Sequence, residues 1–411
     1  MASKVIESDE VASLHVVREL MPWRQQLARG FGTHHGNADV QLIDVLIVML
    51  AAFFNPLVRS QRLVEALSSQ QWMKDQTGIQ RIPKSTLSDA LARFDPEQLR
   101  PLIQQLVKRV PALGRRDADL AAITRQIIAA DGSHFHTAVE VAWAMSCGGP
   151  KPKHDQVRWN LQLDVDSFTP VDCDISGLGD GSEPKAFMRR LQPNLLYVFD
   201  RNFRSYELIN AVLAAPSSFV MRVRSDTNFQ VHQSLPLGVK DAQAEVRSDE
   251  RVHFAGAHSA GNQDYRSFSD KPPQQTLRRV VVWDQKNKKE VILLTDLLDV
   301  PAYAVGAIYR QRWQIELFFK WIKAYVEFDH LISHHPNGVQ FQFYVAVIAT
   351  LLLHLATGRR VSKYALFWLG SVAAGHATFE EMQEGLARIE REKERERERR
   401  KRAAERKKIG K

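Results

Sequence analysis

Cysteine is scarce in this chain. Only two cysteines, Cys147 and Cys173, occur in 411 residues. Such usage argues against a disulfide scaffold or a four-cysteine zinc site and is typical of a reducing compartment. Histidine pairs such as His134 and His136 also lack the spacing of a zinc site. They are either exposed loop residues or residues that line a site near Asp131.

Long uninterrupted apolar runs are lacking as well. Residues 42–58 contain Asp44, and residues 341–357 contain His354, so both fall short of the ~20 apolar residues that span a bilayer. The N-terminal sequence MASKVIESDEV has no apolar core behind its charges, which a signal peptide requires. We interpret both runs as buried helices, and we expect no membrane partner and a cytoplasmic location.

The composition is that of a globular, basic protein. The chain is 44% hydrophobic and 25% charged, with a formal net charge of +9. Its 411 residues exceed one ordinary core and indicate two or three domains. A basic balance permits a nucleic-acid partner without establishing one.

Residues 1–120 are predicted to form a helical N-terminal, DNA-binding domain. Apolar residues in 42–54, 63–73 and 99–110 follow a helical period. Ser85 is a candidate N-cap for a helix that runs to Arg93. This helix is either the second helix of a helix-turn-helix, with residues 84–93 in a DNA groove, or part of an ordinary helical bundle.

From about residue 126 the pattern predicts a mixed α/β sheet. The short run 127–130 ends on Asp131, and alternating runs at 157–166 and 170–175 complete an antiparallel meander. A helix, a strand ending on Asp200, a second helix and a further strand follow, at 183–191, 194–199, 206–214 and 218–223. Both aspartates stand where an apolar strand stops, which is where open α/β sheets place ligands.

The helical period disappears between residues 224 and 298. Strand-like segments at 245–254, 277–283 and 290–295 predict a β-rich insertion, and the last two form a hairpin that contains Trp283. Helical patterns then return in residues 299–375. Residues 376–411 are almost all charged and form a helical or disordered tail.

A charged stripe occupies the stretch YRQRWQIELFFKWIK. On one helix, Tyr309, Arg312, Glu316, Lys320 and Lys323 fall at steps of 3, 4, 4 and 3, between two apolar flanks. Charges beside apolar surface are costly unless they are paired or bound to something. One glutamate cannot neutralise three cations, so an anion, or a metal on the glutamate, completes this surface.

Three carboxylates carry the candidate chemistry. Asp131, Asp200 and Glu316 together could hold two Mg²⁺ ions, because this ion prefers oxygen ligands and takes one or two carboxylates each. A two-ion site stabilises the attacking and leaving oxygens of a phosphoryl displacement. Taken singly, each residue has a simpler interpretation: a turn, a helix cap or an internal salt bridge.

The stripe resembles a signature of the DDE transposases with an RNase H-like core. The bacterial insertion-sequence group numbered four carries Tyr-x2-Arg-x3-Glu-x6-Lys, and Tyr309, Arg312, Glu316 and Lys323 match it at every position. The resemblance implies a split catalytic domain, residues 121–223 and 299–375, with the β-rich insertion between its parts.

The same resemblance assigns the acidic residues. Asp131 of DGS becomes the first carboxylate, Asp200 of FDRNF the second and Glu316 the third, all three as metal ligands and catalytic residues. The chain departs from the family at Asn202, where glycine is frequent. Tyr309, Arg312, Lys320, Lys323 and Trp283 are the expected DNA-binding residues.

The resemblance also implies a reaction and partners. It predicts Mg²⁺-dependent cut-and-paste transposition through a DNA hairpin, with two ions that Mn²⁺ can replace. A flipped base would stack on Trp283 or Trp313. The expected partners are double-stranded DNA, as inverted repeats and target, and a second copy of the chain, in a nucleoid-associated location. An RNase H-like nuclease without strand transfer and a domesticated DNA-binding protein are the alternatives.

Overall fold

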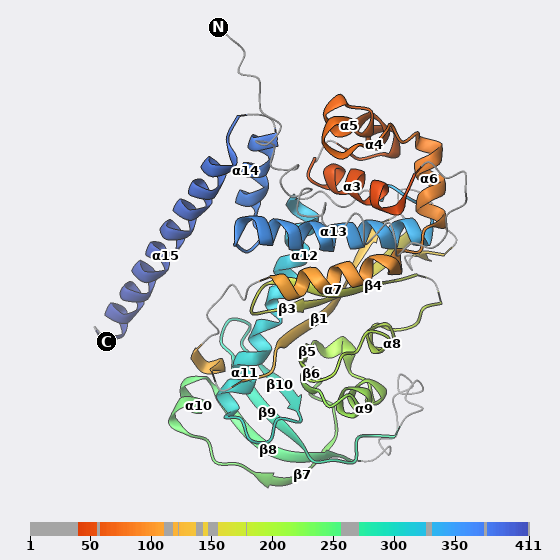
Figure 1. Ribbon diagram of the computed structural model, residues 1–411. Helices are drawn as coiled ribbons and strands as arrows, with labels where there is room; N and C mark the ends of the chain where they lie inside the picture. Colours follow the sequence, from red (N-terminus) through yellow and green to blue (C-terminus); the bar gives the residue numbers. More distant parts are fainter. Residues whose placement is uncertain are drawn as a thin grey trace. The chain divides into compact units, whose positions relative to one another are not determined.

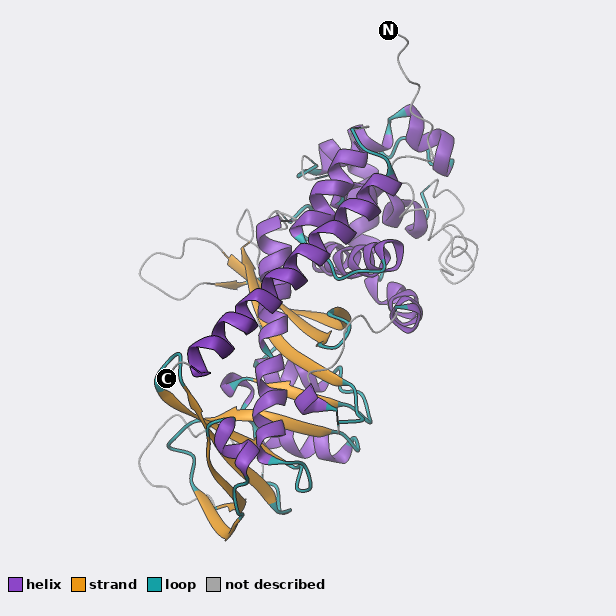
Figure 2. Cartoon of the chain, turned by 90° about the vertical axis from the view of Figure 1, so that its left-hand side faces the viewer, coloured by secondary structure: helices purple, strands orange, loops and turns teal. Residues whose placement is uncertain are grey.

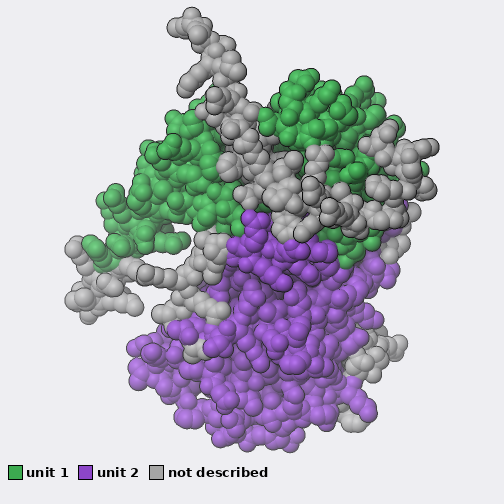
Figure 3. Space-filling model, viewed as in Figure 1, with its two compact units in different colours: residues 1–99, 323–328, 337–411 green, residues 100–322, 329–336 purple. Residues whose placement is uncertain are grey.

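The structure, a computed structural model, describes residues 40–55, 58–110, 118–121, 123–136, 143–146, 155–177, 179–255, 271–325, 331–373 and 376–409. Cys147 and the first 39 residues of the predicted helical domain lie outside these residues. The chain divides into two compact units (Figure 3). Unit 1 consists of residues 1–99, 323–328 and 337–411, and unit 2 of residues 100–322 and 329–336. The domain boundaries expected from the sequence stay a prediction.

In the described residues of unit 1, all regular secondary structure is helical (Figure 2). Its helices are α3 (Leu42–Phe53), α4 (Gln61–Ser68), α5 (Gln71–Thr77), α6 (Lys84–Arg93), the 3₁₀ helix η2 (Pro96–Leu99), α13 (Pro336–Thr357), α14 (Lys363–Ala373) and α15 (Phe379–Ile409). The helical pattern predicted for residues 42–110 is therefore confirmed for the described part. The predicted helix over residues 63–73 is two helices, α4 and α5, which are separated at Ser69 and Gln70.

The two apolar runs of the sequence form buried helices, α3 and α13, as predicted. Ten of the twelve residues of α3 are buried. Among the described residues, α13 is the one helix long and apolar enough to cross a membrane, and 89% of its most apolar window is buried within the protein. Burial of this kind is what the core helix of a globular unit requires.

The start of α6 differs from the prediction. Ser85 is not the N-cap: the cap position is Pro83, and no side chain caps the helix locally. Instead, the backbone N–H of Lys84 donates to Oε2 of Glu65 on α4 (3.1 Å), and Nε of Arg81 donates to the same carboxylate (3.0 Å). A neighbouring helix therefore supplies the acceptor that the predicted cap would have provided.

Unit 2 is built on a ten-stranded mixed sheet, which confirms the mixed α/β class. Its strands are β1 (Ile127–His136), β2 (Met145–Ser146), β3 (Asp155–Asp164), β4 (Thr169–Ser176), β5 (Leu196–Phe199), β6 (Ser218–Val223), β7 (Phe229–Ser234), β8 (Val246–Phe254), β9 (Leu277–Asp284) and β10 (Lys289–Thr295). The order is β2-β3-β1-β5-β6-β10-β9-β8-β7, and β4 also pairs with β3. The predicted antiparallel meander is present as β1, β3 and β4, whereas β1, β5 and β6 are parallel neighbours.

The residues between 224 and 298 extend this sheet. The predicted hairpin is confirmed as β9 and β10, and β10 pairs in turn with β6. Strand β7 and the short helix α10 (Val239–Gln243) were not expected. Most side chains of β7 are exposed, so its sequence lacks the alternation that marks a half-buried strand.

Two elements near the predicted site differ from the expectation. Strand β1 does not stop at Asp131 but continues to His136, because its antiparallel pairing with β3 continues to the pair His136↔Gln156. The stretch 309–323 is not one helix: α11 (Ala302–Gln311) and α12 (Trp313–Tyr325) meet at Arg312. Arg312 keeps helical backbone angles (φ −53°, ψ −32°), so the helical phase of the stripe persists across the break.

Helices cover both faces of the sheet in unit 2 (Figure 1). The remaining helices of this unit are α7 (Arg100–Arg109), α8 (Glu183–Met188), α9 (Tyr206–Ala214) and the 3₁₀ helices η3 (Ala118–Leu120) and η4 (Arg201–Phe203). Helices α8 and α9 pack on one face in an apolar cluster with Tyr197, Phe199 and Phe219. Helix α11 contacts β5, β6, β9 and β10. The predicted bounds of α9 and β6 are confirmed.

Candidate active site

Asp131 and Asp200 stand at the same level of two neighbouring strands. β1 and β5 are parallel, and their register pairs Ile127 with Leu196 and Ala129 with Val198. Two further residues along each strand lead to Asp131 and to Asp200, which directly follows β5. The sheet itself therefore brings the two aspartates together from positions 69 residues apart.

The same register decides which face the aspartates occupy. Successive side chains of a strand point to opposite faces. Ala130 and Phe199 belong to the apolar cluster under α8 and α9, so the next residues, Asp131 and Asp200, point to the opposite face. By the same alternation His134 and His136 lie on the face away from Asp131, and the idea that they line its site is not supported.

The loop after Asp200 holds this carboxylate in a defined position. Asp200 caps η4, and its Oδ1 accepts a hydrogen bond from the backbone N–H of Asn202 (2.7 Å). Asn202 is not among the residues with positive φ. A backbone N–H supplied from ordinary φ angles requires no glycine, so the departure from the family pattern at this position leaves the loop unstrained.

Arg312 contacts the carboxylates of both Asp131 and Glu316. Its Nη1 lies 3.5 Å from Oδ2 of Asp131, and its Nη2 donates to Oε1 of Glu316, one turn further along the chain. The guanidinium also lies over the ring of Tyr309, 5.8 Å from its centroid. The Nε of Arg312 is buried and has no hydrogen-bond partner in the described part of the chain. Arg312 is therefore the counter-charge of Asp131 and Glu316, and its Nε donor is not used in these contacts.

The electrostatics of Asp131 reflect this setting. Burial, with smaller contributions from the carboxylates of Asp200 and Glu183, raises the pKa of Asp131 to about 7, although Arg312 and the N–H of Gly132 lower it. A carboxyl group whose charge is disfavoured near other carboxylates gains from a nearby cation. The donor set, carboxylate oxygens on one face, suits a hard divalent ion.

The acidic side chains of the site are not gathered around one point. Among the described residues, no group of three or more His, Cys, Asp and Glu side chains is gathered closely enough to hold a metal ion. The physical reason is visible in the contacts of Arg312, whose guanidinium occupies the space between Asp131 and Glu316. An ion that bound there would take over the charge-balancing role of Arg312.

Glu183 is an acidic neighbour that the sequence reasoning missed. It is the first residue of α8, and burial raises the pKa of its carboxyl group, while Arg158 lowers it and Asp200 raises it further. A Cβ added to Gly132 would lie 2.5 Å from Oε1 of Glu183 and 3.1 Å from Cδ of Arg158. The glycine of the DGS motif therefore leaves room for the Glu183 carboxylate. An acidic residue just after the Gly-rich stretch GLGDGS was the available signal.

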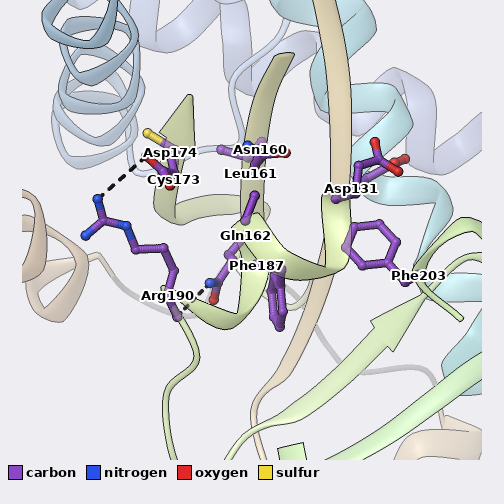
Figure 4. Close-up of a pocket in the computed structure, with 11 residues that line it drawn as sticks. Asp131, Asn160, Leu161, Gln162, Cys173, Asp174, Phe187, Arg190 and Phe203 are labelled. Atoms are coloured by element: carbon purple, nitrogen blue, oxygen red, sulfur yellow. Dashed lines mark hydrogen bonds and ion pairs between the residues drawn. The ribbon is translucent and has the colours of Figure 1, made fainter. Parts of the chain in front are cut away.

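A small cavity lies beside Asp131 and Glu183 (Figure 4). Asp131 and Phe203 lie at one end of it, and Arg190 and Asp174 at the other. Its volume is about 10 Å³. A single water needs about 10–15 Å³ of this kind of space, so the cavity cannot hold a substrate.

A second cavity, of about 970 Å³, adjoins the carboxylates through Arg312. Its lining includes three predicted residues, Trp283, Tyr309 and Arg312, together with Trp313. The two predicted lysines are placed differently. Lys320 is exposed on α12, and Lys323 is half-buried near the end of the same helix, in a segment that belongs to unit 1.

The fold and the site define a mixed α/β protein with two aspartates on one sheet face and an arginine that links one of them to a glutamate. Residues 123–352 match the family model of the transposase DDE domain. This range is more than half of the chain, and the chain belongs to that family. Members of the family are DNA-acting transposases that generally use divalent metal ions.

Three relatives support the assignment. The transposase-like protein y4zB of Sinorhizobium fredii is 27% identical over 215 residues, 52% of this chain and 56% of that protein. The transposase assigned to insertion sequence element IS5377 of Geobacillus stearothermophilus is 27% identical over 38% of each chain. The one assigned to element IS4SA of Synechocystis is 34% identical over 19% of this chain and 25% of its own length. The matches thus span between 25% and 56% of the length of these relatives.

One solved structure covers most of the chain. The piggyBac transposase synaptic complex with hairpin DNA is 11% identical, covers 92% of this chain and 81% of that chain, and has a TM-score of 0.37. A TM-score this low carries no argument about fold or activity.

Proposed function

We propose that this protein is the transposase of an insertion sequence and that it performs cut-and-paste transposition. The reaction is hydrolysis of a phosphodiester at each element end, followed by attack of the free 3′-OH on target DNA. The observation that carries the proposal is the shared level and shared face of Asp131 and Asp200, with Glu316 linked to Asp131 through Arg312. Membership of the transposase DDE domain family supports it.

An RNase H-like core is the proposed architecture of the catalytic unit. The strands β4-β3-β1-β5-β6 form an antiparallel meander followed by two parallel strands. The first and second aspartates belong to the central strand and to its parallel neighbour. This order supports the RNase H-like assignment, with the β-rich insertion attached at β6.

Asp131, Asp200 and Glu316 are the proposed ligands of two Mg²⁺ ions, which Mn²⁺ could replace. When bound, such ions stabilise the attacking and leaving oxygens of the displaced phosphoryl group. The chain fits this role through the oxygen donors of the carboxylates and through the raised pKa of Asp131. The family's general use of divalent ions agrees with it.

The DNA is held by cations and aromatic rings around the carboxylates. Arg312 lines the large cavity and brings positive charge to a phosphate there, and its guanidinium lies over the ring of Tyr309. Lys320 and Lys323 extend the same cationic stripe along α12. Trp283 lines the large cavity and offers its ring to a base that is flipped when a hairpin end forms.

The protein is proposed to act as a homodimer that synapses two element ends, in the cytoplasm and at the nucleoid. Its partners are the terminal inverted repeats and target DNA. The N-terminal helices, including α6, are proposed to contribute DNA binding. Their exposed basic residues Lys84 and Arg93 would contact phosphates.

A labelled duplex of the element end, taken from the DNA that flanks the gene, tests this function. With Mg²⁺ and a target plasmid, hairpin and strand-transfer products are expected. Plain nicks without joining would indicate an RNase H-like nuclease, and binding without cutting would indicate a domesticated DNA-binding protein. Either of these outcomes overturns the proposal.

A further inference from the structure

The large cavity of unit 2 extends beyond the predicted base-stacking residue. Most of its lining residues belong to α10, α11 and the β9–β10 hairpin, and Arg312 is also part of the lining. At about 970 Å³ it stands at the upper end of the ~300–1,000 Å³ that encloses a drug-sized ligand. One flipped base does not need this much space.

Helix α11 forms one wall of the cavity. Tyr303, Gly306 and Tyr309 recur every three residues on the lining face of this helix. Gly306 faces β9, and a Cβ there would lie 3.4 Å from Cγ2 of Val282, an ordinary contact. Tyr303 lies one turn before Gly306, and Trp283 directly follows Val282. Both rings, Tyr303 on α11 and Trp283 on β9, are among the residues that line the cavity.

A basic side chain lies near the ring of Trp283, and another lies near the ring of Tyr303. The guanidinium of Arg247 lies 5.9 Å from the ring centroid of Trp283, and Nζ of Lys240 lies 5.5 Å from that of Tyr303. The position of Lys240 is fixed through its neighbour Asp241, whose Oδ1 accepts from the N–H of Tyr303 (2.8 Å). An aromatic ring with an adjacent cation is the arrangement that proteins use to stack a base and hold its phosphate.

Charge in the cavity favours a polyanion. Six basic side chains line it against three acidic ones. The basic ones are Arg222, Lys240, Lys286, Lys289, Arg310 and Arg312. Two of the acids are already engaged: Glu245 accepts from Arg247 (3.1 Å), and Asp284 accepts from the N–H groups of the hairpin turn. Among the basic residues, Arg310 lies 4.0 Å from the third acid, Asp119, and Arg312 pairs with Asp131 and Glu316. The excess positive charge of the lining therefore comes from Arg222, Lys240, Lys286 and Lys289.

We infer that Tyr303 and Lys240 form a second stacking position for an unpaired DNA strand, in addition to Trp283. The inference rests on the proposed function, because it assumes that DNA reaches the carboxylates of Asp131, Asp200 and Glu316. Nine residues of helix separate Tyr303 from Arg312, about 14 Å at 1.5 Å per residue. In duplex DNA, where the phosphates of one strand are about 3.4 Å apart, this length corresponds to about four nucleotides. The cavity thus holds several consecutive unpaired nucleotides that lead to the carboxylates.

Binding of tailed DNA to the full-length protein tests the inference. A fluorescent duplex of fixed sequence carries single-stranded tails of zero to six thymidines, and Kd is measured by anisotropy in EDTA. Wild-type protein should bind more tightly as the tail lengthens. Loss of one stacked base in Tyr303→Ala should weaken binding of the six-nucleotide tail roughly 5- to 100-fold, with no change for the blunt duplex.

Matched variants separate stacking from other roles. Tyr303→Phe keeps the ring and should bind like wild type. Tyr364→Ala removes a tyrosine in unit 1 that also has lysines over its ring, and it should leave the tail dependence unchanged. Lys240→Gln should reduce the salt dependence of tailed-duplex binding by about one phosphate contact.

Two results overturn the inference: wild-type tail dependence in Tyr303→Ala, or an equal loss of affinity for blunt and tailed DNA. Because the assay contains EDTA, it requires no cleavage. A protein that forms hairpin and strand-transfer products but shows no role for Tyr303 retains the proposed function and loses only this inference. A protein that depends on Tyr303 but never cuts loses only the proposed function.

Discussion

Arg312, at the junction of α11 and α12, reaches Asp131 in the middle of β1, with 3.5 Å between Nη1 and Oδ2. The two residues are 181 positions apart in the chain. The same guanidinium pairs with Glu316. One arginine thus compensates two carboxylates that are proposed as metal ligands.

Replacing Arg312 with alanine should make stability depend on metal. Without the guanidinium, two part-buried carboxylates lose their counter-charge, and the free energy of unfolding should fall by about 1–3 kcal/mol. Mg²⁺ should then raise the Tm of Arg312→Ala more than that of wild type, because the ion restores the missing charge. Thermal unfolding in EDTA and in Mg²⁺ measures both effects. Arg310→Ala, which removes a more exposed neighbouring arginine, is the control. Equal Mg²⁺ responses in the three proteins would contradict the expectation.

The isosteric variants Asp131→Asn, Asp200→Asn and Glu316→Gln should each abolish cleavage of element ends. Losing even a residue that supports a metal ligand costs about 10–100-fold, so losing a ligand should cost more than about 100-fold. DNA binding, measured in EDTA, should stay close to wild type. The exposed Asp226→Asn is the control. Cleavage near the wild-type rate in any one of the three variants would remove that residue from the site.

The ion pair between Arg278 and Asp249 should stabilise the insertion. Both side chains are 4% exposed, and Nη2 of Arg278 lies 2.6 Å from Oδ2 of Asp249. Asp249→Asn leaves a buried guanidinium without its charge partner and should cost about 3–5 kcal/mol in urea unfolding. Breaking the exposed pair between Arg400 and Glu396 with Glu396→Gln should cost less than about 1 kcal/mol. Similar losses for both pairs would show that burial does not govern the effect.

Two helical glycines should respond differently to alanine. A Cβ on Gly385 would lie 2.3 Å from Cζ2 of Trp368, so overpacking of about 1–3 kcal/mol should outweigh the gain of ~1 kcal/mol in helix propensity. A Cβ on Gly306 would meet Val282 at 3.4 Å, an ordinary contact, so Gly306→Ala should keep or raise the Tm. Differential scanning calorimetry compares the two, and an equal drop in Tm would count against this account.

Local signals in the sequence predicted several elements at their full length. α9 begins after Ser205, whose hydroxyl accepts from the N–H of Leu208, and its buried face contains Leu208, Ile209 and Val212. The cap and the apolar face of α9 lie within ten residues of each other, so the local sequence alone was enough to predict this helix. The antiparallel meander was predictable for a similar reason, because an apolar run at 127–130 is followed by two alternating runs.

Features set by distant partners were not predictable. Pairing with β3 extends β1 past Asp131, and Glu65 on another helix takes the place of the expected cap at Ser85. β7 exists because it pairs with β8, although its exposed side chains carry no strand pattern. The three carboxylates were named from spacing and resemblance. Arg312 as their link, and Glu183 behind Gly132, required the register of the sheet.

Strands β5, β6, β10 and β9 are paired without a break, so the sheet fixes the distance between β5 and β9. Three inter-strand steps of about 4.8 Å place the hairpin strand roughly 14 Å from the strand that leads to Asp200. Backbone hydrogen bonds, rather than loops, set this span. Changes to the hairpin turn therefore cannot lengthen the path between Trp283 on β9 and the strand that leads to Asp200.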